Sequence, residues 1–169
     1  MANGGGWALV SRTRPKPRRL GFMHRTQSRP PYLDAGDRVI LFDGVCRLCN
    51  AWCRFILKYD TRQRFRMAPV QSRAGQAILA HFGLPTDRFD TMLYVEGYQA
   101  HERSDAVLRV VTQLGGPWRL AAVLWLCPRR VRDFVYDRIA RHRYRLFGRY
   151  DQCELPPSDN AKRFLDSRD

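Results

Sequence analysis

Residues 39–60 read VILFDGVCRLCNAWCRFILKYD, and this stretch decides the fold of the chain. Its first four residues are all apolar, as expected for a strand that is buried on both faces. Asp43 and Gly44 then interrupt the apolar run at a tight turn. Beyond the turn, apolar side chains recur at the helical steps of three and four: Trp52, Phe55, Ile56 and Tyr59. The stretch therefore predicts a strand, a turn and a helix that opens with two cysteines.

These two cysteines, Cys46 and Cys49, form a C-x-x-C pair at the expected start of the helix. A helix start offers unpaired backbone N–H groups and the positive end of the helix dipole, and both favour a thiolate over a thiol. We therefore expect a depressed pKa for Cys46, which makes its sulfur able to attack a disulfide. Cys49 lies one turn later and is placed to resolve the mixed disulfide. Arg47 either stabilises the thiolate or faces solvent.

The turn and the cysteine pair together read D-x-x-C-x-x-C, from Asp43 to Cys49, and a later segment reads RYRLFG at residues 143–148, followed by Cys153 and Pro156. In these features the chain resembles the DCC family of thiol–disulfide oxidoreductases, from about residue 39 to about residue 157. The resemblance implies exchange of a dithiol with a disulfide, with Cys46 attacking and Cys49 resolving. Such a mechanism needs no bound cofactor and no metal, only a reducing partner.

The cysteines also allow other interpretations. A structural zinc site commonly uses two C-x-x-C-like pairs, and the sequence holds no second pair. Cys53 lies on the same helix face as Cys49 and is either a small buried hydrophobe, a redox reserve or a third metal ligand. Cys127 lies in an apolar run and is expected to be a packing residue. Cys153 matches a position of the family, and its partner is left open.

Asp43 has two candidate roles. It is placed to take the proton of Cys49 as a general base, or it is a turn carboxylate that accepts local backbone N–H groups. The sequence does not decide between them. Thioredoxin-like enzymes usually carry a cis-proline opposite the cysteines, whereas the matching stretch, residues 89–92, has none. The backbone of Asp90 and Thr91 is therefore the alternative place for substrate docking.

The remaining periodicity predicts an α/β domain with a thioredoxin-like mixed β-sheet flanked by helices. Strands are expected at 39–42, 65–69, 91–95 and 99–103, and helices at 47–59, 75–82 and from Ser104 or Asp105, either of which is a candidate cap. Two further helices, 120–126 and 131–147, form a C-terminal extension. In the second of these, we expect a buried apolar stripe of Val131, Phe134, Val135 and Ile139, with its arginines mostly outside.

The ends of the chain differ in composition from its middle. Residues 1–36 are basic and rich in Gly and Pro, so we expect a disordered tail whose true start is either Met1 or Met23. A presequence for an organelle would have a similar composition. Residues 37–157 are expected to form one domain, and residues 158–169 a second tail. Neither a secretory signal nor an apolar run of the ~20 residues that span a membrane is found.

The composition limits the class of protein and its partners. The 169 residues carry a formal net charge of +14, which permits nucleic acid, anionic membrane or acidic protein partners but also describes a merely solvated basic surface. Three of the five cysteines lie within residues 46–53, a clustering typical of reactive or metal-binding thiols in a reducing, cytoplasmic compartment.

The leading interpretation is thus a thiol–disulfide oxidoreductase whose substrate is a disulfide-containing protein or a small thiol, reduced in turn by a partner protein. The alternative is a non-enzymatic basic binding module, stabilised by metal or binding nucleic acid or an anionic surface. The arginine-rich last helix carries aromatic residues suited to such binding: Tyr136, Tyr144, Phe147 and Tyr150. We expect no sequence-specific nucleic acid binding and, at most, weak contact with an anionic surface. Substrate, direction of electron flow and oligomeric state are left open.

Overall fold

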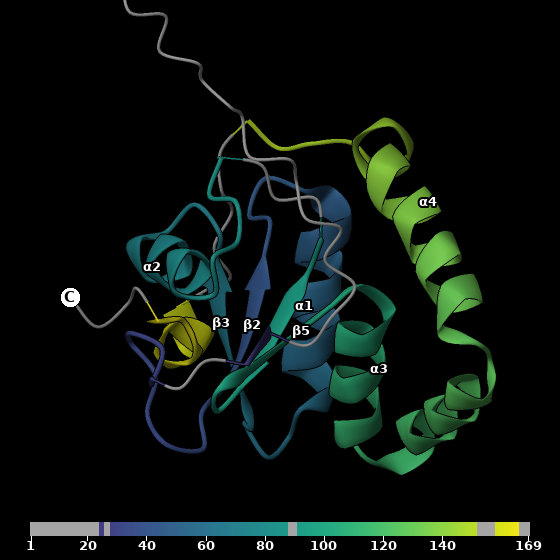
Figure 1. Ribbon diagram of the computed structural model, residues 1–169, viewed down its shortest axis with the longest axis horizontal. Coiled ribbons are helices and arrows are strands. Elements are labelled where there is room, and N and C mark those ends of the chain that lie inside the picture. Colours follow the sequence, from purple (N-terminus) through teal and green to yellow (C-terminus); the bar gives the residue numbers. More distant parts are fainter. Residues whose placement is uncertain (1–23, 26–27, 88–90, 152–157, 166–169) are drawn as a thin grey trace, which may run out of the picture.

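The computed structural model describes residues 24–25, 28–87, 91–151 and 158–165 of the chain (Figure 1). A five-stranded sheet forms its centre, with helices on both faces. The strands are β1 (His24–Arg25), β2 (Arg38–Phe42), β3 (Phe65–Pro69), β4 (Leu93–Glu96) and β5 (Gln99–Glu102). The helices are α1 (Arg47–Tyr59), α2 (Arg73–His81), α3 (Arg103–Gln113) and α4 (Arg129–Phe147), with 3-10 segments η1 (Gly116–Leu126) and η2 (Ser158–Arg163).

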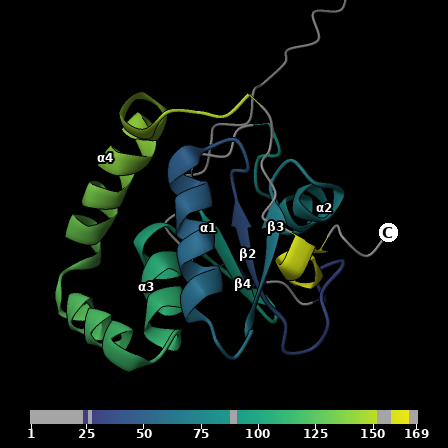
Figure 2. The same cartoon turned by 180° about the vertical axis from the view of Figure 1, so that it is seen from behind.

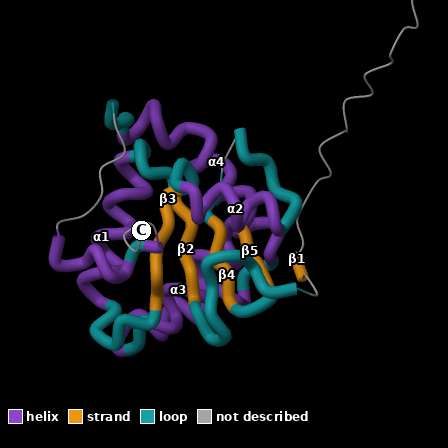
Figure 3. The backbone as a smooth tube through the Cα atoms, turned by 90° about the vertical axis from the view of Figure 1, so that its left-hand side faces the viewer, coloured by secondary structure: helices purple, strands orange, loops and turns teal. Residues whose placement is uncertain are grey.

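The strands are ordered β1-β5-β4-β2-β3 across the sheet, as the tube view shows (Figure 3). β2 and β3 are parallel and are joined through α1, whereas β4 and β5 form an antiparallel hairpin that leads into α3. β2 also pairs antiparallel with β4, so the sheet is mixed. A β-α-β unit followed by β-β-α around one mixed sheet is the thioredoxin-like arrangement, and the predicted α/β fold class is confirmed.

The core lies on both faces of the sheet because successive residues of a strand point to opposite sides. Val39 and Leu41 of β2 pack toward α2 with Ile78 and Leu79. Ile40 and Phe42 pack on the other face, toward α1 and α3, in a cluster of Cys53, Ile56, Phe65, Met67, Tyr94, Ala106 and Val110. β2 is therefore buried on both faces, as its unbroken apolar run predicts.

The elements nearest the C-x-x-C pair begin and end close to the predicted residues. α1 covers 47–59 as predicted, and β3 ends at Pro69 as predicted. α2 begins two residues before the predicted 75, because Ser72 caps it by accepting the Gly75 N–H at 3.0 Å. Gly75 is needed there, since a Cβ at this position would lie 2.2 Å from the carbonyl oxygen of Pro69.

The prediction that Ser104 or Asp105 caps α3 is wrong. The helix begins at Arg103, and its cap residue Glu102 makes no capping side-chain hydrogen bond. Both predicted caps have other partners on α4: the Ser104 hydroxyl donates to Asp133 at 2.5 Å, and Asp105 forms an ion pair with Arg132 at 3.3 Å. These residues therefore attach the C-terminal extension to the domain.

The prediction that residues 158–169 form a loose tail is wrong for the part that the structure describes. η2 lies against the sheet, and Phe164 and Leu165 are buried in the core (Figure 2). Arg163 is also buried and donates to Asp60 at 2.5 Å and to the Phe65 carbonyl oxygen at 3.0 Å. A buried carboxylate after α1 and a buried arginine far along the chain thus form one ion pair, which no local sequence pattern indicates.

The N-terminal boundary also lies earlier than predicted. Leu33 is 5% exposed and packs in the core cluster beside α2, although the prediction assigns it to a disordered tail. His24 and Arg25 pair with β5 as an added edge strand. Residues 1–23 lie outside the described residues, so the prediction for them stays untested.

The C-terminal extension is present but packs differently from the prediction. η1 is a 3-10 helix that begins at Gly116 rather than a helix over 120–126, and Trp118 docks it on α1 by ring contacts with Phe55 and Tyr59 at 4.8 and 5.0 Å. The predicted buried stripe of α4 is wrong: Val131, Phe134, Val135 and Ile139 are all exposed. The helix instead packs through its polar side, with Arg143 buried.

Candidate active site

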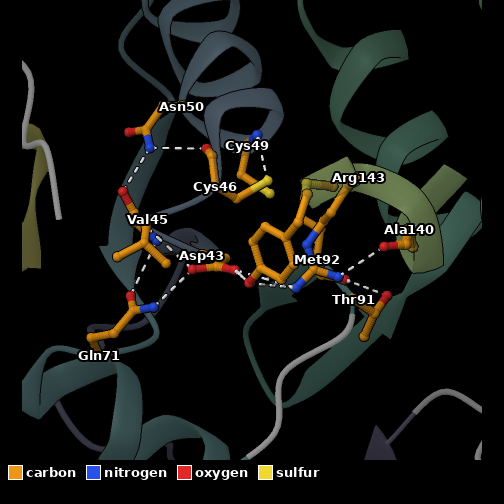
Figure 4. Close-up of polar contacts among 12 residues, drawn as sticks. Asp43, Val45, Cys46, Cys49, Asn50, Gln71, Thr91, Met92, Ala140 and Arg143 are labelled. Atoms are coloured by element: carbon orange, nitrogen blue, oxygen red, sulfur yellow. Dashed lines mark hydrogen bonds and ion pairs between the residues drawn. The ribbon is translucent and has the colours of Figure 1, made fainter. Parts of the chain in front are cut away.

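Cys46 occupies the N-cap position of α1, at the end of the turn that follows β2. Its backbone is extended, and its Sγ accepts a hydrogen bond from the Cys49 backbone N–H at 3.4 Å (Figure 4). Asn50 holds the turn by donating to the carbonyl oxygens of Gly44, at 2.7 Å, and Cys46, at 3.0 Å. The predicted placement of the sulfur at the positive end of a helix is confirmed.

The two thiols have opposite pKa shifts. A hydrogen bond from the Cys49 side chain is the main cause that lowers the pKa of Cys46 to about 6, and the Cys49 backbone N–H and the positive charge of Arg143 act in the same direction. The same side-chain hydrogen bond raises the pKa of Cys49, and burial raises it further. Of the two sulfurs, Cys46 is therefore the one that loses its proton first.

Asp43 is buried directly behind the cysteines and accepts hydrogen bonds through both oxygens. Oδ1 accepts from the Val45 N–H at 3.2 Å and from Gln71 at 2.8 Å. Oδ2 accepts from Arg143 at 3.2 Å and from the Tyr144 hydroxyl. Burial alone raises the pKa of Asp43, but the hydrogen bonds from Tyr144, Gln71 and Arg143 outweigh burial and lower it.

Arg143 links α4 to the cysteine pair. Its guanidinium is buried and forms an ion pair with Asp43 across 100 residues of sequence. It also lies over the Tyr144 ring, 4.5 Å from the ring centroid, and donates to the Ala140 carbonyl oxygen at 3.1 Å. The prediction that the α4 arginines lie mostly outside is therefore wrong for this residue. Its position within the RYRLFG segment signals a role, but only the fold brings it to Asp43.

Cys46 is 0% exposed, because the backbone after α4 covers it. Arg149 forms a β-bridge with Cys46, and the Tyr150 N–H donates to the Val45 carbonyl oxygen at 2.8 Å. The Tyr150 ring packs under Arg47 at 5.1 Å and its hydroxyl accepts from Arg54 at 3.2 Å. Arg47 is exposed, as one of the two expectations for it had it, and it also contacts this cover. We call residues 148–150 the cover segment.

Gly148 allows the chain to turn from α4 into the cover segment. Its φ of 84° lies in the left-handed region, which a residue with a Cβ adopts only under strain. A Cβ there would also lie 3.3 Å from the Cδ of Arg47. The glycine of the RYRLFG segment therefore has a structural reason, and it fixes where the chain passes over Cys46.

Cys49 faces the opposite side, where a cavity of about 320 Å³ separates α1 from α4. Its walls are mainly apolar: Phe42, Leu48, Trp52, Met92, Val107 and Ile139. Asp43, Thr91, Tyr136 and Arg143 are the polar residues that line it together with Cys49. The cavity is large enough for an apolar side chain or a small ligand beside the second sulfur.

Tyr136 of α4 occupies the place opposite the cysteines. Its hydroxyl accepts the Met92 N–H at 2.8 Å and the Thr91 hydroxyl at 3.1 Å, and burial raises its pKa. The Thr91 side chain in turn accepts the Arg103 N–H at 3.2 Å. Thr91, whose backbone is an expected docking site for substrate, thus forms a side-chain hydrogen bond to α4. Asp90, the other expected docking residue, lies outside the described residues.

The structure describes two of the other three cysteines, Cys53 and Cys127. Cys53 is buried in the core beneath α1, as predicted for a packing residue. Cys127 is only half-buried, next to a Leu126 that is 84% exposed, so the packing expected of it is partial. Cys153 lies outside the described residues. Within the described part of the chain, no group of three His, Cys, Asp or Glu side chains is arranged to hold a metal ion.

Sequence reasoning identified the acidic turn and both sulfurs, and the structure brings these three residues together. Sequence reasoning missed the residues from elsewhere in the chain that surround the turn and the cysteines: Gln71, Tyr136, Arg143, Tyr144 and Tyr150. Such an arrangement, a low-pKa thiolate hydrogen-bonded to a high-pKa thiol beside an apolar cavity, is suited to thiol–disulfide exchange.

Comparisons with known proteins agree with this chemistry. Residues 40–149 match the model of the DCC1-like thiol-disulfide oxidoreductase family. The chain is 45% identical over 129 residues to the uncharacterized protein YuxK of Bacillus subtilis, which covers 76% of this chain and 94% of YuxK. It is 38% identical over 118 residues to a chloroplastic DCC family protein of Arabidopsis thaliana, which covers 69% of each chain. No solved structure matches significantly. By the match to the family model, which includes the Cys46–Cys49 pair, the chain belongs to the DCC1-like thiol-disulfide oxidoreductase family.

Proposed function

We propose that the Cys46–Cys49 dithiol reduces a disulfide of a protein or small-thiol substrate and is restored by a reducing partner. The observation that carries the proposal is the pairing of the two sulfurs at the start of α1, where Cys46 has a pKa of about 6 and Cys49 a raised one. This difference supports Cys46 as the attacking group, since it is the sulfur that loses its proton first.

The exchange proceeds in two displacements. The Cys46 thiolate attacks one sulfur of the substrate disulfide, the substrate S–S bond breaks, and the other substrate sulfur leaves as a thiolate that takes a proton. Cys49 then loses its proton and attacks the Cys46 sulfur, which releases the second substrate thiol. The protein ends as a Cys46–Cys49 disulfide, two electrons have passed to the substrate, and a dithiol partner reverses the process.

Arg143 and Asp43 support the first displacement from behind the pair. Arg143 brings positive charge to the thiolate, and Asp43 holds Arg143 in place while its own charge opposes the thiolate. A lowered pKa makes Asp43 a weaker base, which favours a positioning role over proton transfer from Cys49. We therefore propose Asp43 as a positioning residue, with the general-base role as the alternative.

Access to the two sulfurs differs. The cover segment lies over Cys46, whereas the cavity reaches Cys49. We propose that the cover segment moves aside for the first displacement, and that an apolar group next to the substrate disulfide enters the cavity between α1 and α4. A dithiol that reduces substrates must itself be kept reduced, and thiols are kept reduced in the cytosol, so we propose a cytoplasmic location.

The function is tested with anaerobically purified full-length protein, assayed for reduction of glutathione disulfide and of a protein disulfide. We expect Cys46→Ser to abolish exchange, Cys49→Ser to trap a mixed disulfide on Cys46 that mass spectrometry locates, and Cys53→Ser to leave exchange nearly unchanged. Elemental analysis accompanies each variant. If all three cysteines prove equally necessary and each loss releases a stoichiometric metal, the protein is a metal-binding module and the proposal is wrong.

A further inference from the structure

The outer face of η1 and α4 carries large apolar side chains that no part of the described chain covers. Leu126 is 84% and Phe134 67% exposed, and the others are at least 44% exposed: Leu120, Val123, Leu124, Val131, Val135, Ile139, Leu146 and Phe147. Scattered exposed apolar residues are normal on a protein surface, but ten within residues 120–147 are a local concentration that calls for a partner. We call these ten residues the apolar face.

The charged residues of the same two elements that are classed as exposed are all positive. The exposed charged side chains of residues 116–147 are Arg119, Arg130, Arg138, Arg141 and Arg145. The two acidic residues of this segment both have partners on α3: Asp133 accepts from Ser104 at 2.5 Å, and Asp137, whose side chain is 37% exposed, pairs with Arg103 at 3.3 Å. The apolar face is therefore bordered by positive charge that is not neutralised on the surface.

The spacing along α4 separates the two kinds of side chain. Val131, Val135 and Ile139 follow one another at steps of four, so they form one line along the helix. Arg138, Arg141 and Arg145, at steps of three and four, form a second line beside it. Figure 1 shows α4 at the outer edge of the molecule, beyond α3. The apolar and cationic lines therefore run side by side along the exposed part of α4, and the apolar line reaches the cavity wall at Ile139.

We propose that this face docks on the surface of an anionic lipid bilayer. Apolar side chains enter the boundary between headgroups and acyl chains, while arginine stems extend to the phosphates, which is how surface-bound amphipathic helices are held. Trp125 lies at the edge of the face, with the Arg132 guanidinium 4.7 Å from its ring centroid, and a tryptophan there suits the headgroup level. Anionic lipids also attract the net charge of +14.

Charge argues against two other candidates for covering the apolar face, a second copy of this chain and residues 1–23. A second copy of this chain would bring five exposed arginines against five, and both molecules carry +14. Residues 1–23 contain five basic and no acidic residues, so this segment is repelled by the same surface. Both would instead be attracted to an anionic bilayer. Because Ile139 belongs both to the apolar face and to the cavity wall, docking brings the cavity beside Cys49 close to the lipid.

The test is cosedimentation of the full chain with vesicles of phosphatidylcholine alone and with phosphatidylglycerol added, at low and at physiological salt. We expect binding only with phosphatidylglycerol, weakened by salt. Leu126→Ser together with Phe134→Ser should lower the vesicle partition coefficient about tenfold or more, since two large side chains no longer enter the lipid. Arg138→Gln with Arg145→Gln should lower it less and reduce its salt dependence.

The matched controls are Tyr32→Ser with Tyr98→Ser, which remove exposed aromatic rings elsewhere, and Arg62→Gln with Arg73→Gln. These should bind nearly as the unchanged chain does, and circular dichroism should show all variants folded. The proposal is overturned if the Leu126 and Phe134 variant binds normally, or if deletion of residues 1–22 alone abolishes binding. It is also overturned if vesicles are not bound and the apolar substitutions instead dissociate a dimer.

Discussion

At the scale of single residues, the ion pair between Asp43 and Arg143 joins the redox turn to the C-terminal extension. Both side chains are buried, so removing one partner leaves a charge in the interior without its counterion. The position of Asp43 beside the cysteines is predictable, because the strand, turn and helix are adjacent in sequence. The pairing of Asp43 with Arg143 is not predictable, because Arg143 lies 100 residues later and α4 carries several other arginines.

We predict that Arg143→Gln lowers the free energy of unfolding by about 3–5 kcal/mol. It should also raise the pKa of Cys46, because a positive charge that favours the thiolate is lost. Denaturant unfolding measures the first effect, and the pH dependence of Cys46 alkylation the second. The matched variant Arg145→Gln, on the exposed side of the same helix, should change neither. Equal behaviour of the two variants would show that the ion pair does not support the site.

At the scale of elements, the strand, turn and helix at residues 38–59 match the sequence prediction because local signals agree there. An apolar run, a turn and a helical period follow one another without conflict. α4 shows where such signals fail. Its apolar residues satisfy the helical period, but the helix packs through polar contacts of Asp133, Tyr136 and Arg143, and the apolar line faces outward. Periodicity finds a helix and cannot say which face is buried.

The cover segment gives a prediction at the same scale. Tyr150→Ala removes the hydrogen bond from Arg54 and the contact with Arg47, so the segment opens more often. We expect alkylation of Cys46 to become roughly 3- to 10-fold faster while its pH midpoint stays the same. Tyr98→Ala, in the exposed turn between β4 and β5, is the control. A shifted midpoint with an unchanged plateau rate would mean that Tyr150 acts on the thiolate and not on access.

At the scale of the whole molecule, described residues near both ends of the chain are buried where composition predicts disordered tails. Residues 160–165 include the two basic residues Lys162 and Arg163, yet Arg163, Phe164 and Leu165 are buried. Composition predicts order poorly here because a few residues decide it: one arginine satisfies Asp60, and two apolar side chains fill the core on either side of the sheet edge. The same holds for Leu33 near the other end.

We therefore predict that truncation after residue 157 strongly destabilises the protein. Burial of each large apolar side chain contributes about 1.5–3 kcal/mol, and Asp60 loses its buried partner as well. Thermal unfolding should shift to a much lower midpoint or lose its cooperativity. Deletion of residues 1–22, which starts the chain at Met23, should leave the midpoint nearly unchanged. Equal midpoints for the full chain and the C-terminal truncation would show that η2 does not belong to the folded domain.

The most direct test of the account is the pH dependence of alkylation at each cysteine of the reduced, full-length protein, quantified by mass spectrometry of the modified peptides. We predict that the rate at Cys46 rises with pH through a midpoint near 6 and then levels off, while Cys49 stays unreactive over the same range because its pKa is raised. Cys49→Ala should move the Cys46 midpoint upward, since the hydrogen bond that lowers the pKa is lost. A Cys46 midpoint at the ~8.5 of a free cysteine, or preferential alkylation of Cys49 at neutral pH, would contradict the assignment of Cys46 as the attacking thiolate.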